Sequence, residues 1–234
     1  MLQVLDHGFV RLHNASGPVR RIHAQYDAHD TDPAITARMS FNNFHKDRKI
    51  EQDLRLCDYL MSHDHSTPFE MIELWIEMKL PIFVARQFVR HRTVSINEVS
   101  GRYVTLPAEW YIPATVGGKP VGGAKQGQSD TLPLEIQDRF RKALNSQCES
   151  SYYKYLSALE LGVAPEHARM FLHLNNYTHW IWKQDLHNMM HFLSKRLPKD
   201  AQFEARQYGT AILSMLEEHL PNLMQLFRKY KLHD

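Results

Sequence analysis

Hydrophobic and polar residues alternate most clearly between residues 71 and 80. One set of alternate positions is wholly apolar: Ile72, Leu74, Ile76, Met78 and Leu80. Charged residues and a tryptophan fill the positions between them. This period of two predicts a strand with one buried face and one open face. Pro81 follows, and because proline fits the first turn of a helix, we expect a helix to open there and continue through Ile82.

Apolar residues spaced three or four apart predict helices in most of the remaining chain. The expected ranges are 47–62, 82–90, 136–160, a segment opening at Pro165 that carries Arg169, 185–197, 201–219 and 222–230. Further strands are expected at 102–112 and 177–182. Gly162 should close the long helix, and Asp185 should cap a helix start. The pattern predicts one α+β domain over residues 1–234, with a small, mostly antiparallel sheet flanked by helices.

The segment 115–131 is rich in glycine and interrupts the periodic pattern. It also contains lysines, which raises the possibility of a phosphate-binding loop. Its glycines, however, do not match GxxxxGK[ST], and no predicted strand runs directly into a helix across it. We therefore interpret it as a mobile surface loop.

Composition and charge narrow the class of protein. The formal net charge of +2 is nearly balanced, whereas proteins that bind nucleic acid usually carry a large basic excess. The first residues do not resemble a signal peptide, and no apolar run reaches the length of a membrane span. The two cysteines, Cys57 and Cys148, lie far apart on apolar stripes, which favours a reducing compartment. We expect a cytoplasmic protein that binds neither nucleic acid nor membrane.

Candidate chemistry concentrates at the end of the helix that follows Pro81. The residues concerned are Arg90, His91, Arg92, Glu98, Ser100, Gly101, Arg102 and Tyr103. Arginine binds phosphate oxygens through a planar fork, and a Ser-Gly-Arg turn offers a hydroxyl, an unhindered backbone N–H and a guanidinium. The segment therefore predicts a site for phosphate-bearing small molecules. The alternative is a solvated basic helix end that the helix dipole favours.

The arrangement Arg90-His91-Arg92, seven residues and then Ser100 resembles the signature of flavin-dependent thymidylate synthases, the ThyX family. Three further blocks resemble that family in the correct order: His65-Ser66-Thr67-Pro68-Phe69-Glu70, residues 81–87 and residues 185–196. The resemblance implies a ThyX-like fold and the methylation of dUMP to dTMP. It implies 5,10-methylenetetrahydrofolate as carbon donor, NADPH as reductant and FAD as bound cofactor. It also implies a homotetramer with shared active sites, and no metal site is expected.

The resemblance assigns a role to each matching residue. dUMP would be bound by Gln87, Arg90, Glu98, Ser100, Gly101, Arg102, Arg169 and Arg196. FAD would be bound by Thr67, Arg90, His91, Arg92, Glu98, Asp185, His187 and His191. His65 and Tyr103 would lie on the folate or flavin side. Arg196 would be catalytic, because a guanidinium beside the uracil ring stabilises the negative charge that develops there. Arg169 would reach the phosphate from a neighbouring subunit.

Several of these residues also have simpler interpretations. Ser100 could be a nucleophile, but a serine needs an adjacent base, which the sequence does not identify, so we prefer phosphate binding. Thr67 could be a turn residue and Tyr103 an ordinary strand aromatic. Arg196 could bind the last carbonyls of its helix, and Glu98 could be a surface carboxylate. The segment 198–202 departs from family members that carry a histidine before Ala-Gln, so a cofactor contact at Asp200 stays open.

Two other function classes could use the same kinds of residue. A metal-dependent hydrolase could bind zinc through His63 and His65 or through His187 and His191, although the HExxH motif is absent. A nucleic-acid-binding module could use the arginines beside aromatic residues, but the near-neutral charge counts against it. Neither cysteine stands in a plausible reactive setting, which fits a flavin route better than a thiolate route.

Overall fold

The computed structural model describes residues 1–21, 25–44, 48–120, 122 and 127–232. Within these residues the strands form one antiparallel sheet. They are β1 (Leu2–Val4), β2 (Gly8–Arg21), β3 (Gln25–Asp27), β4 (Glu73–Pro81), β5 (Ser95–Glu98) and β6 (Tyr177–Asp185). Their order is β1-β2-β4-β6-β5, and β3 pairs with β2. The sheet confirms the predicted α+β class with antiparallel pairing.

Strand β4 is the centre of the sheet and follows the predicted alternation. Its even-numbered residues are completely buried, whereas the odd-numbered residues from Glu73 to Lys79 are only partly buried; Pro81 at the end of the strand is buried again. It pairs along its whole length with β6, from Glu73 opposite Asp185 to Pro81 opposite Tyr177. The strand therefore begins two residues later and ends one residue later than the predicted range of 71–80. Pro81 ends the strand and precedes helix α4 (Ile82–Phe88) instead of forming the first turn of that helix.

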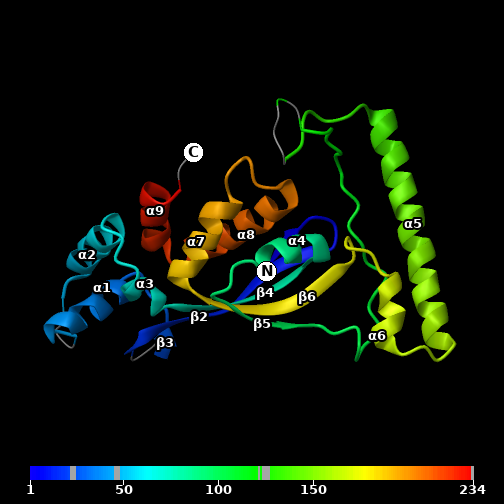
Figure 1. Ribbon diagram of the computed structural model, residues 1–234. Helices are drawn as coiled ribbons and strands as arrows, with labels where there is room; N and C mark the ends of the chain where they lie inside the picture. The colour runs from blue at the N-terminus through cyan, green and yellow to red at the C-terminus, as the bar shows by residue number, and fades with distance from the viewer. Residues whose placement is uncertain (22–24, 45–47, 121, 123–126, 233–234) are drawn as a thin grey trace.

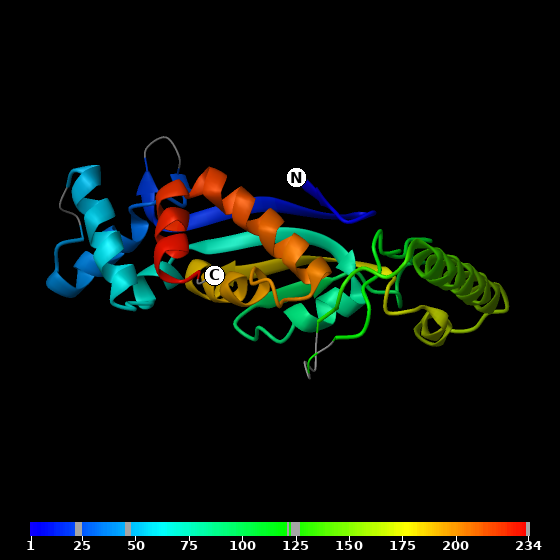
Figure 2. The same ribbon diagram turned by 90° about the horizontal axis from the view of Figure 1, so that it is seen from above.

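The helices lie in three groups around the sheet. Helices α4, α7 (Leu186–Arg196) and α8 (Phe203–His219) lie over one face of it (Figure 1). One end carries α1 (Asp32–Ala37), the 3-10 turn η1 (Arg38–Phe41), α2 (Ile50–Ser62), α3 (Thr67–Glu70) and α9 (Pro221–Tyr230). The long helix α5 (Leu134–Glu160), with α6 (Pro165–Ala168) and the 3-10 turn η2 (Arg169–Phe171), forms the opposite end (Figure 2).

The main core fills the space between the sheet and its covering helices. Phe88 at the end of α4 packs edge-on against Phe192 of α7, with ring centroids 4.8 Å apart, and against Trp182 of β6 at 6.0 Å. Burial of side chains of this size stabilises the fold by about 1.5–3 kcal/mol each. This packing fixes the end of α4, which leads into Arg90-His91-Arg92, against the helix that ends at Arg196.

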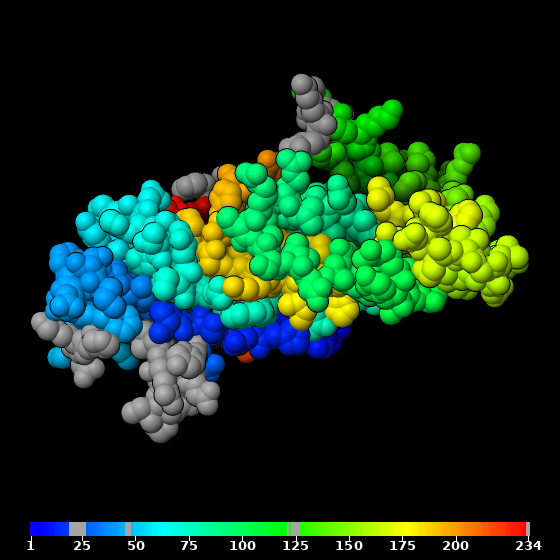
Figure 3. Space-filling model, turned by 60° about the horizontal axis from the view of Figure 1, so that its bottom comes forward, coloured from blue at the N-terminus to red at the C-terminus, as the bar shows by residue number. Residues whose placement is uncertain are grey.

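The other face of the sheet has no helix over it among the described residues. Glu77 of β4 is the polar centre of this face. It accepts a hydrogen bond from Arg11 at 3.0 Å, and its carboxylate oxygens lie 2.7 Å from the Nε2 atoms of His13 and His179. Strands β2 (blue) and β6 (yellow) reach the surface in the space-filling view (Figure 3).

A second, smaller core lies at the α5 end of the molecule. Tyr155 is fully buried there and packs with Ala158 of α5 and with Ala168 of α6. Tyr152, Leu156, Leu159 and Leu172 are partly buried against this cluster. This small core joins α5 to the segment that carries Arg169.

Most of the predicted helices are confirmed with shifted ends. Asp185 caps α7, because its Oδ1 accepts the backbone N–H of Asn188 at 2.8 Å. Gly162, with φ +81°, follows the end of α5. Helices α8 and α9 meet at Pro221 as predicted. The predicted helix at Pro165 ends at Ala168, and Arg169 begins a separate 3-10 turn. Residues 45–47 lie outside the described residues, and α2 begins at Ile50.

One predicted strand is wrong. Residues 102–112 form turns and irregular backbone with a single bridge from Trp110 to Asn176, and the short edge strand is β5 instead. Pro107 has no N–H to donate to a ladder, and the backbone of Leu106 bonds to α5 side chains. The sequence pattern also gave no sign of the N-terminal strands β1, β2 and β3.

The glycine-rich segment is described in part. Gly117 bridges to Thr131, and Gly118 donates to the carbonyl of Asp130 at 3.1 Å, so the two ends of the segment pair with each other. No strand runs into a helix through the described part. The mobility of the segment stays a prediction, because residues 121 and 123–126 lie outside the description. No described helix combines the length and apolar character that crossing a bilayer requires.

Candidate active site

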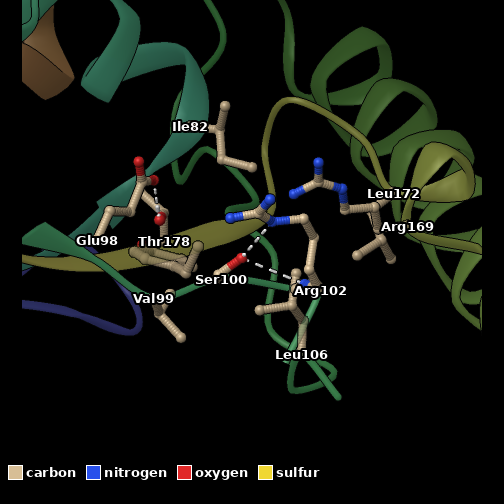
Figure 4. A pocket seen from close by; sticks show the side chains of 11 residues that line it. Ile82, Glu98, Val99, Ser100, Arg102, Leu106, Arg169, Leu172 and Thr178 are labelled. Atoms are coloured by element: carbon tan, nitrogen blue, oxygen red, sulfur yellow. Dashed lines mark hydrogen bonds between the residues drawn. The ribbon is translucent and has the colours of Figure 1, made fainter. Parts of the chain in front are cut away.

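A cavity of about 460 Å³ lies where β5, β6 and η2 meet. It is lined by Ile82, Glu98, Val99, Ser100, Gly101, Arg102, Leu106, Arg169, Leu172, Tyr177 and Thr178. Five of the eight residues expected to bind dUMP are among them. In the close-up view the guanidinium groups of Arg102 and Arg169 both reach into the same space (Figure 4). Convergent polar groups in a concave site are typical of a small-molecule site.

Ser100 and Arg102 form a tight turn directly after β5. The chain leaves the sheet after Val99, whose N–H donates to the carbonyl of His179 at 2.8 Å. The Ser100 hydroxyl oxygen then accepts the backbone N–H and the Nε–H of Arg102, both at 3.3 Å. Tyr103 supports the same guanidinium, which lies 5.0 Å from its ring centroid. Arg102 is thus oriented before any ligand binds.

The arginines of the cavity have no acidic partner among the described residues. No ion pair there involves Arg102 or Arg169, while many of the other basic side chains do pair with a carboxylate. Two close guanidinium groups without a counter-charge form a strong anion site. A single chain brings Arg169 to this cavity. The sequence resemblance predicts Arg169 from a neighbouring subunit, whereas Arg169 of the same chain lines this cavity; the subunit that supplies Arg169 to a bound phosphate stays a prediction.

Gly101 allows the cavity walls to approach closely. A Cβ atom at this position would lie 2.9 Å from Cδ1 of Leu106 and 3.5 Å from Cδ of Arg169. The first distance is shorter than ordinary van der Waals contact, so even alanine would displace a neighbour. Gly101 therefore leaves room for Leu106 and keeps its own backbone accessible to a ligand.

Glu98 forms the opposite wall of the cavity. Its carboxylate accepts a hydrogen bond from the hydroxyl of Thr178 on the neighbouring strand β6 (Figure 4). Thr178 is buried and fixes the position of a carboxylate that is itself largely exposed. Glu98 is thus an oriented wall of the site, which argues against an unstructured surface carboxylate. Hydroxyl groups of a sugar are suitable donors for such a carboxylate.

Ser100 has no base to activate it among the described residues. The hydrogen bonds described for its hydroxyl group come from Arg102 alone. Serine needs a neighbouring base to act as a nucleophile. The geometry therefore favours Ser100 as a binding group over Ser100 as a nucleophile.

A second group of predicted residues gathers where α4 meets α7, apart from the cavity lining. Arg196 donates through Nη2 to the carbonyl of Gln87 at 3.0 Å and lies 3.2 Å from Nε2 of His91. Its Nε is buried and has no hydrogen-bond partner in the described part of the chain. The amide of Gln87 donates to Gln202. These bonds go to another helix, which counts against Arg196 as a cap of its own helix end.

Burial sets the electrostatics of this second group. Burial is the main cause that lowers the pKa of His91 to about 4, and electrostatic repulsion from Arg196 and from His191 lowers it further. The imidazole of His91 is therefore neutral near pH 7. Burial also lowers the pKa of Arg196, although arginine keeps its charge in proteins. The pair therefore presents one cation and one neutral ring. An unpartnered donor on a partly buried cation fits an electron-rich acceptor such as a ring carbonyl.

The remaining predicted residues lie around α3 and the start of α7. His65 stacks near Tyr59, with ring centroids 6.1 Å apart, and Thr67 begins α3, which packs against α7. Both oxygens of Asp185 accept hydrogen bonds from Asn188, so this carboxylate has a structural role as a helix cap. His187 lies on the same helix as His191. These residues do not line the cavity, and their assignment to a cofactor stays a prediction.

Residues with the chemistry of FAD ligands lie beside the second group. Arg90 and Arg92 follow α4, are exposed and take part in no ion pair among the described residues. The ring of His91 packs 6.0 Å from that of His191. Unpaired guanidinium groups beside imidazoles fit the diphosphate and the ring system of a dinucleotide cofactor, so the residues present fit a flavin.

Metal and thiol chemistry find little support in the described residues. They contain no group of three or more His, Cys, Asp or Glu side chains placed to share a metal ion. Burial raises the pKa of Cys57 to about 12 and also raises the pKa of Cys148. Both thiols are buried and protonated near neutral pH, as their places on apolar stripes predicted.

The sequence did not predict the uncharged residues that line the cavity. These are Ile82, Val99, Leu106, Leu172, Tyr177 and Thr178. Thr178 left a usable signal, because it is a small hydroxyl residue among the aromatic residues at the start of β6. The others resemble ordinary core or loop residues in the sequence.

The fold is α+β, and its cavity contains two arginines without acidic partners among the described residues, as expected of a site for an anionic ligand. The family model described as "Thymidylate synthase complementing protein" matches residues 22–222. Relatives named flavin-dependent thymidylate synthase are similar over nearly the whole chain. The Gluconobacter oxydans enzyme is 40% identical over 98% of this chain and 73% of its own length, and the Thermus thermophilus enzyme is 41% identical over 99% and 79%. The chain belongs to the flavin-dependent thymidylate synthase family.

A solved structure supports the fold. The UMP/dUMP methylase PolB from Streptomyces cacaoi, solved with 5-Br dUMP, superimposes with a TM-score of 0.82 over 98% of each chain. Sequence identity to it is 23%, so this likeness concerns the fold. Together with the family membership it establishes that the chain has the fold of this enzyme family.

Proposed function

We propose that this enzyme methylates dUMP to dTMP and binds the phosphate of dUMP in the cavity between Ser100, Gly101, Arg102 and Arg169. One observation supports this most strongly: two guanidinium groups without acidic partners among the described residues converge on one cavity. A phosphate monoester provides the charge and the oxygen geometry that such a pair binds best. Glu98, held by Thr178 on the opposite wall, would accept a hydrogen bond from the sugar.

In this proposal 5,10-methylenetetrahydrofolate donates the carbon and NADPH supplies the electrons. FAD, when bound, supplies the hydride that completes the methyl group. Gln87 and Arg90 would contribute to dUMP binding from the end of α4. Arg90, His91, Arg92, Glu98, Thr67, Asp185, His187 and His191 would hold the flavin, with His65 and Tyr103 on the folate or flavin side.

Arg196 is the proposed catalytic residue. Its guanidinium is partly buried, is already oriented by the carbonyl of Gln87 and keeps Nε free of a partner in the described part of the chain. A donor of this kind beside uracil would stabilise negative charge on the ring oxygen and N3. That stabilisation makes C5 of the ring a better carbon nucleophile. The neutral His91 beside it would leave Arg196 as the dominant local charge.

We propose further that the active sites are shared in a homotetramer. The Arg196 group does not line the cavity of its own chain, which supports a site completed by a second copy. Apolar side chains are also exposed along α5 and η2, among them Phe140 at 45% and Met170 at 75%. Co-expression of Arg102→Ala and Arg196→Ala chains with different tags tests this. Purified mixed oligomers should regain activity; verified mixed oligomers that stay inactive would contradict shared sites.

A tritium-release assay tests the reaction itself. The purified enzyme should release tritium from 5-tritiated dUMP only when methylenetetrahydrofolate and NADPH are both present. The preparation should be yellow and lose its colour on addition of NADPH. Tritium release that proceeds without folate, or a colourless protein that needs zinc, would contradict the proposed function.

A further inference from the structure

The hydroxyl groups of two α5 tyrosines hold the backbone of one cavity residue. Tyr155 accepts the N–H of Leu106 at 3.0 Å, and Tyr152 donates to the carbonyl of Leu106 at 3.0 Å. Both polar groups of the Leu106 backbone are therefore satisfied by side chains of one helix. The surrounding segment belongs to no strand, so it has no ladder to supply these bonds instead.

Leu106 transmits this restraint to the phosphate-binding turn. Its side chain lies against the Gly101 backbone, where an added Cβ would meet Leu106 Cδ1 at 2.9 Å. Leu106 also lines the cavity. A shift of Leu106 would therefore change the space beside Gly101 and the path of the turn from Ser100 to Arg102.

Tyr155 also supports the other edge of the cavity. The ring is fully buried against Ala168, the residue directly before Arg169. Leu172, at the end of the same turn, packs on this cluster and lines the cavity. One buried side chain thus contacts the supports of both guanidinium groups.

We propose that Tyr155, assisted by Tyr152, is a positioning residue that sets the spacing between Arg102 and Arg169 for a phosphate monoester. This inference rests on the proposed binding of dUMP in the cavity. Tyr155 does not line the cavity and acts through Leu106 and Ala168. Its hydroxyl holds Leu106 in place before the ligand arrives, so binding does not have to order the turn.

Tyr155→Phe removes one oxygen atom, keeps the ring in the small core and leaves the Leu106 N–H without its partner. We expect the Kd for dUMP to rise about five- to tenfold, while turnover at saturating dUMP stays within about twofold. The affinity for deoxyuridine, which lacks the phosphate, should not change. Tyr153→Phe is the matched control, because Tyr153 lies on the same helix and is 72% exposed; it should bind dUMP as the parent enzyme does.

Coupling to the cavity separates positioning from a general loss of stability. If Tyr155 acts through the phosphate-binding turn, Tyr155→Phe should weaken dUMP binding much less in an Arg102→Ala background than in the parent enzyme. Isothermal titration of the flavin-loaded enzyme with dUMP and with deoxyuridine provides all of these constants. Tyr152→Phe takes the place of Tyr155→Phe should the latter fail to fold, with the same expected results.

The possible failures are distinguishable. A parent enzyme that does not bind dUMP would overturn the proposed function. A parent enzyme that binds dUMP while Tyr155→Phe binds it equally well would overturn only the positioning role. Three other results would also overturn only the positioning role. Tyr155→Phe could lose affinity for dUMP and for deoxyuridine equally, or Tyr153→Phe could lose as much dUMP affinity as Tyr155→Phe does. The effects of Tyr155→Phe and Arg102→Ala on dUMP binding could also be fully additive.

Discussion

Replacing Arg102 by alanine tests the phosphate site with little risk to the fold. Arg102 is exposed and bonds to Ser100 Oγ at 3.3 Å and to the hydroxyl of Tyr103 at 3.1 Å. It takes part in no ion pair among the described residues. Exposed substitutions of this kind change the free energy of unfolding by no more than about 0.5 kcal/mol. A loss of binding in Arg102→Ala would therefore report on the ligand contact and not on unfolding.

The expected size of the effect follows from the charge of the contact. A hydrogen bond to a charged group contributes about 1.5–3 kcal/mol. Since about 1.4 kcal/mol corresponds to a factor of ten, the Kd for dUMP should rise about 10- to 150-fold. Arg102→Lys should give an intermediate loss, because lysine keeps the charge but not the planar fork.

Isothermal titration with dUMP and deoxyuridine is the assay. Arg102→Ala should weaken dUMP binding and leave deoxyuridine binding unchanged, because only dUMP carries the phosphate. Arg139→Ala is the control, since Arg139 is an exposed arginine of α5 that does not line the cavity. Unchanged dUMP affinity in Arg102→Ala, or an equal loss for both ligands, would refute the assignment of Arg102 to the phosphate.

Three further predictions concern other residues of the site. Arg196→Ala should reduce kcat more than dUMP affinity in steady-state assays; an equal loss of both would contradict a catalytic role. Ser100→Ala should keep measurable turnover, and complete inactivity with intact dUMP binding would restore the nucleophile hypothesis. The pKa of His91 is about 4 in the folded protein, against 6.5 for an ordinary histidine. As the pH falls from 6.5 to 4, the unfolded chain binds a proton at His91 that the folded chain does not, so the free energy of unfolding should decrease through that range. His91→Gln should show a smaller fall in Tm there, whereas parallel Tm curves would argue against this linkage.

Local sequence patterns correctly predicted the parts of the fold whose structure depends on residues close together in the sequence. The alternation around Ile76 and the capping position of Asp185 depend on neighbours within a few residues, and both agree with the structure. The segment 102–112 depends on distant partners, because Tyr152 and Tyr155 bind its backbone. A sequence pattern cannot show that such partners replace a strand ladder.

The residues of the candidate site also fall into those that the sequence predicted and those that only the structure revealed. Charged groups of the signature segment were visible in the sequence, and Ser100 and Arg102 do meet at one cavity. Thr178, Leu106 and Leu172 were missed, since their role follows from the meeting of β6, α5 and η2 in space. The sequence could not show that Arg169 and Ser100 of one chain line the same cavity, because this depends on how α5 packs against the segment after α6.

The most direct test of the central claim is a crystal structure of the flavin-loaded enzyme with dUMP. The account predicts the phosphate between the guanidinium groups of Arg102 and Arg169, within hydrogen-bond distance of Ser100. It also predicts the uracil ring beside Arg196, from the same chain or from a second copy. A phosphate bound elsewhere, or the two arginines left without dUMP at saturating concentration, would contradict it.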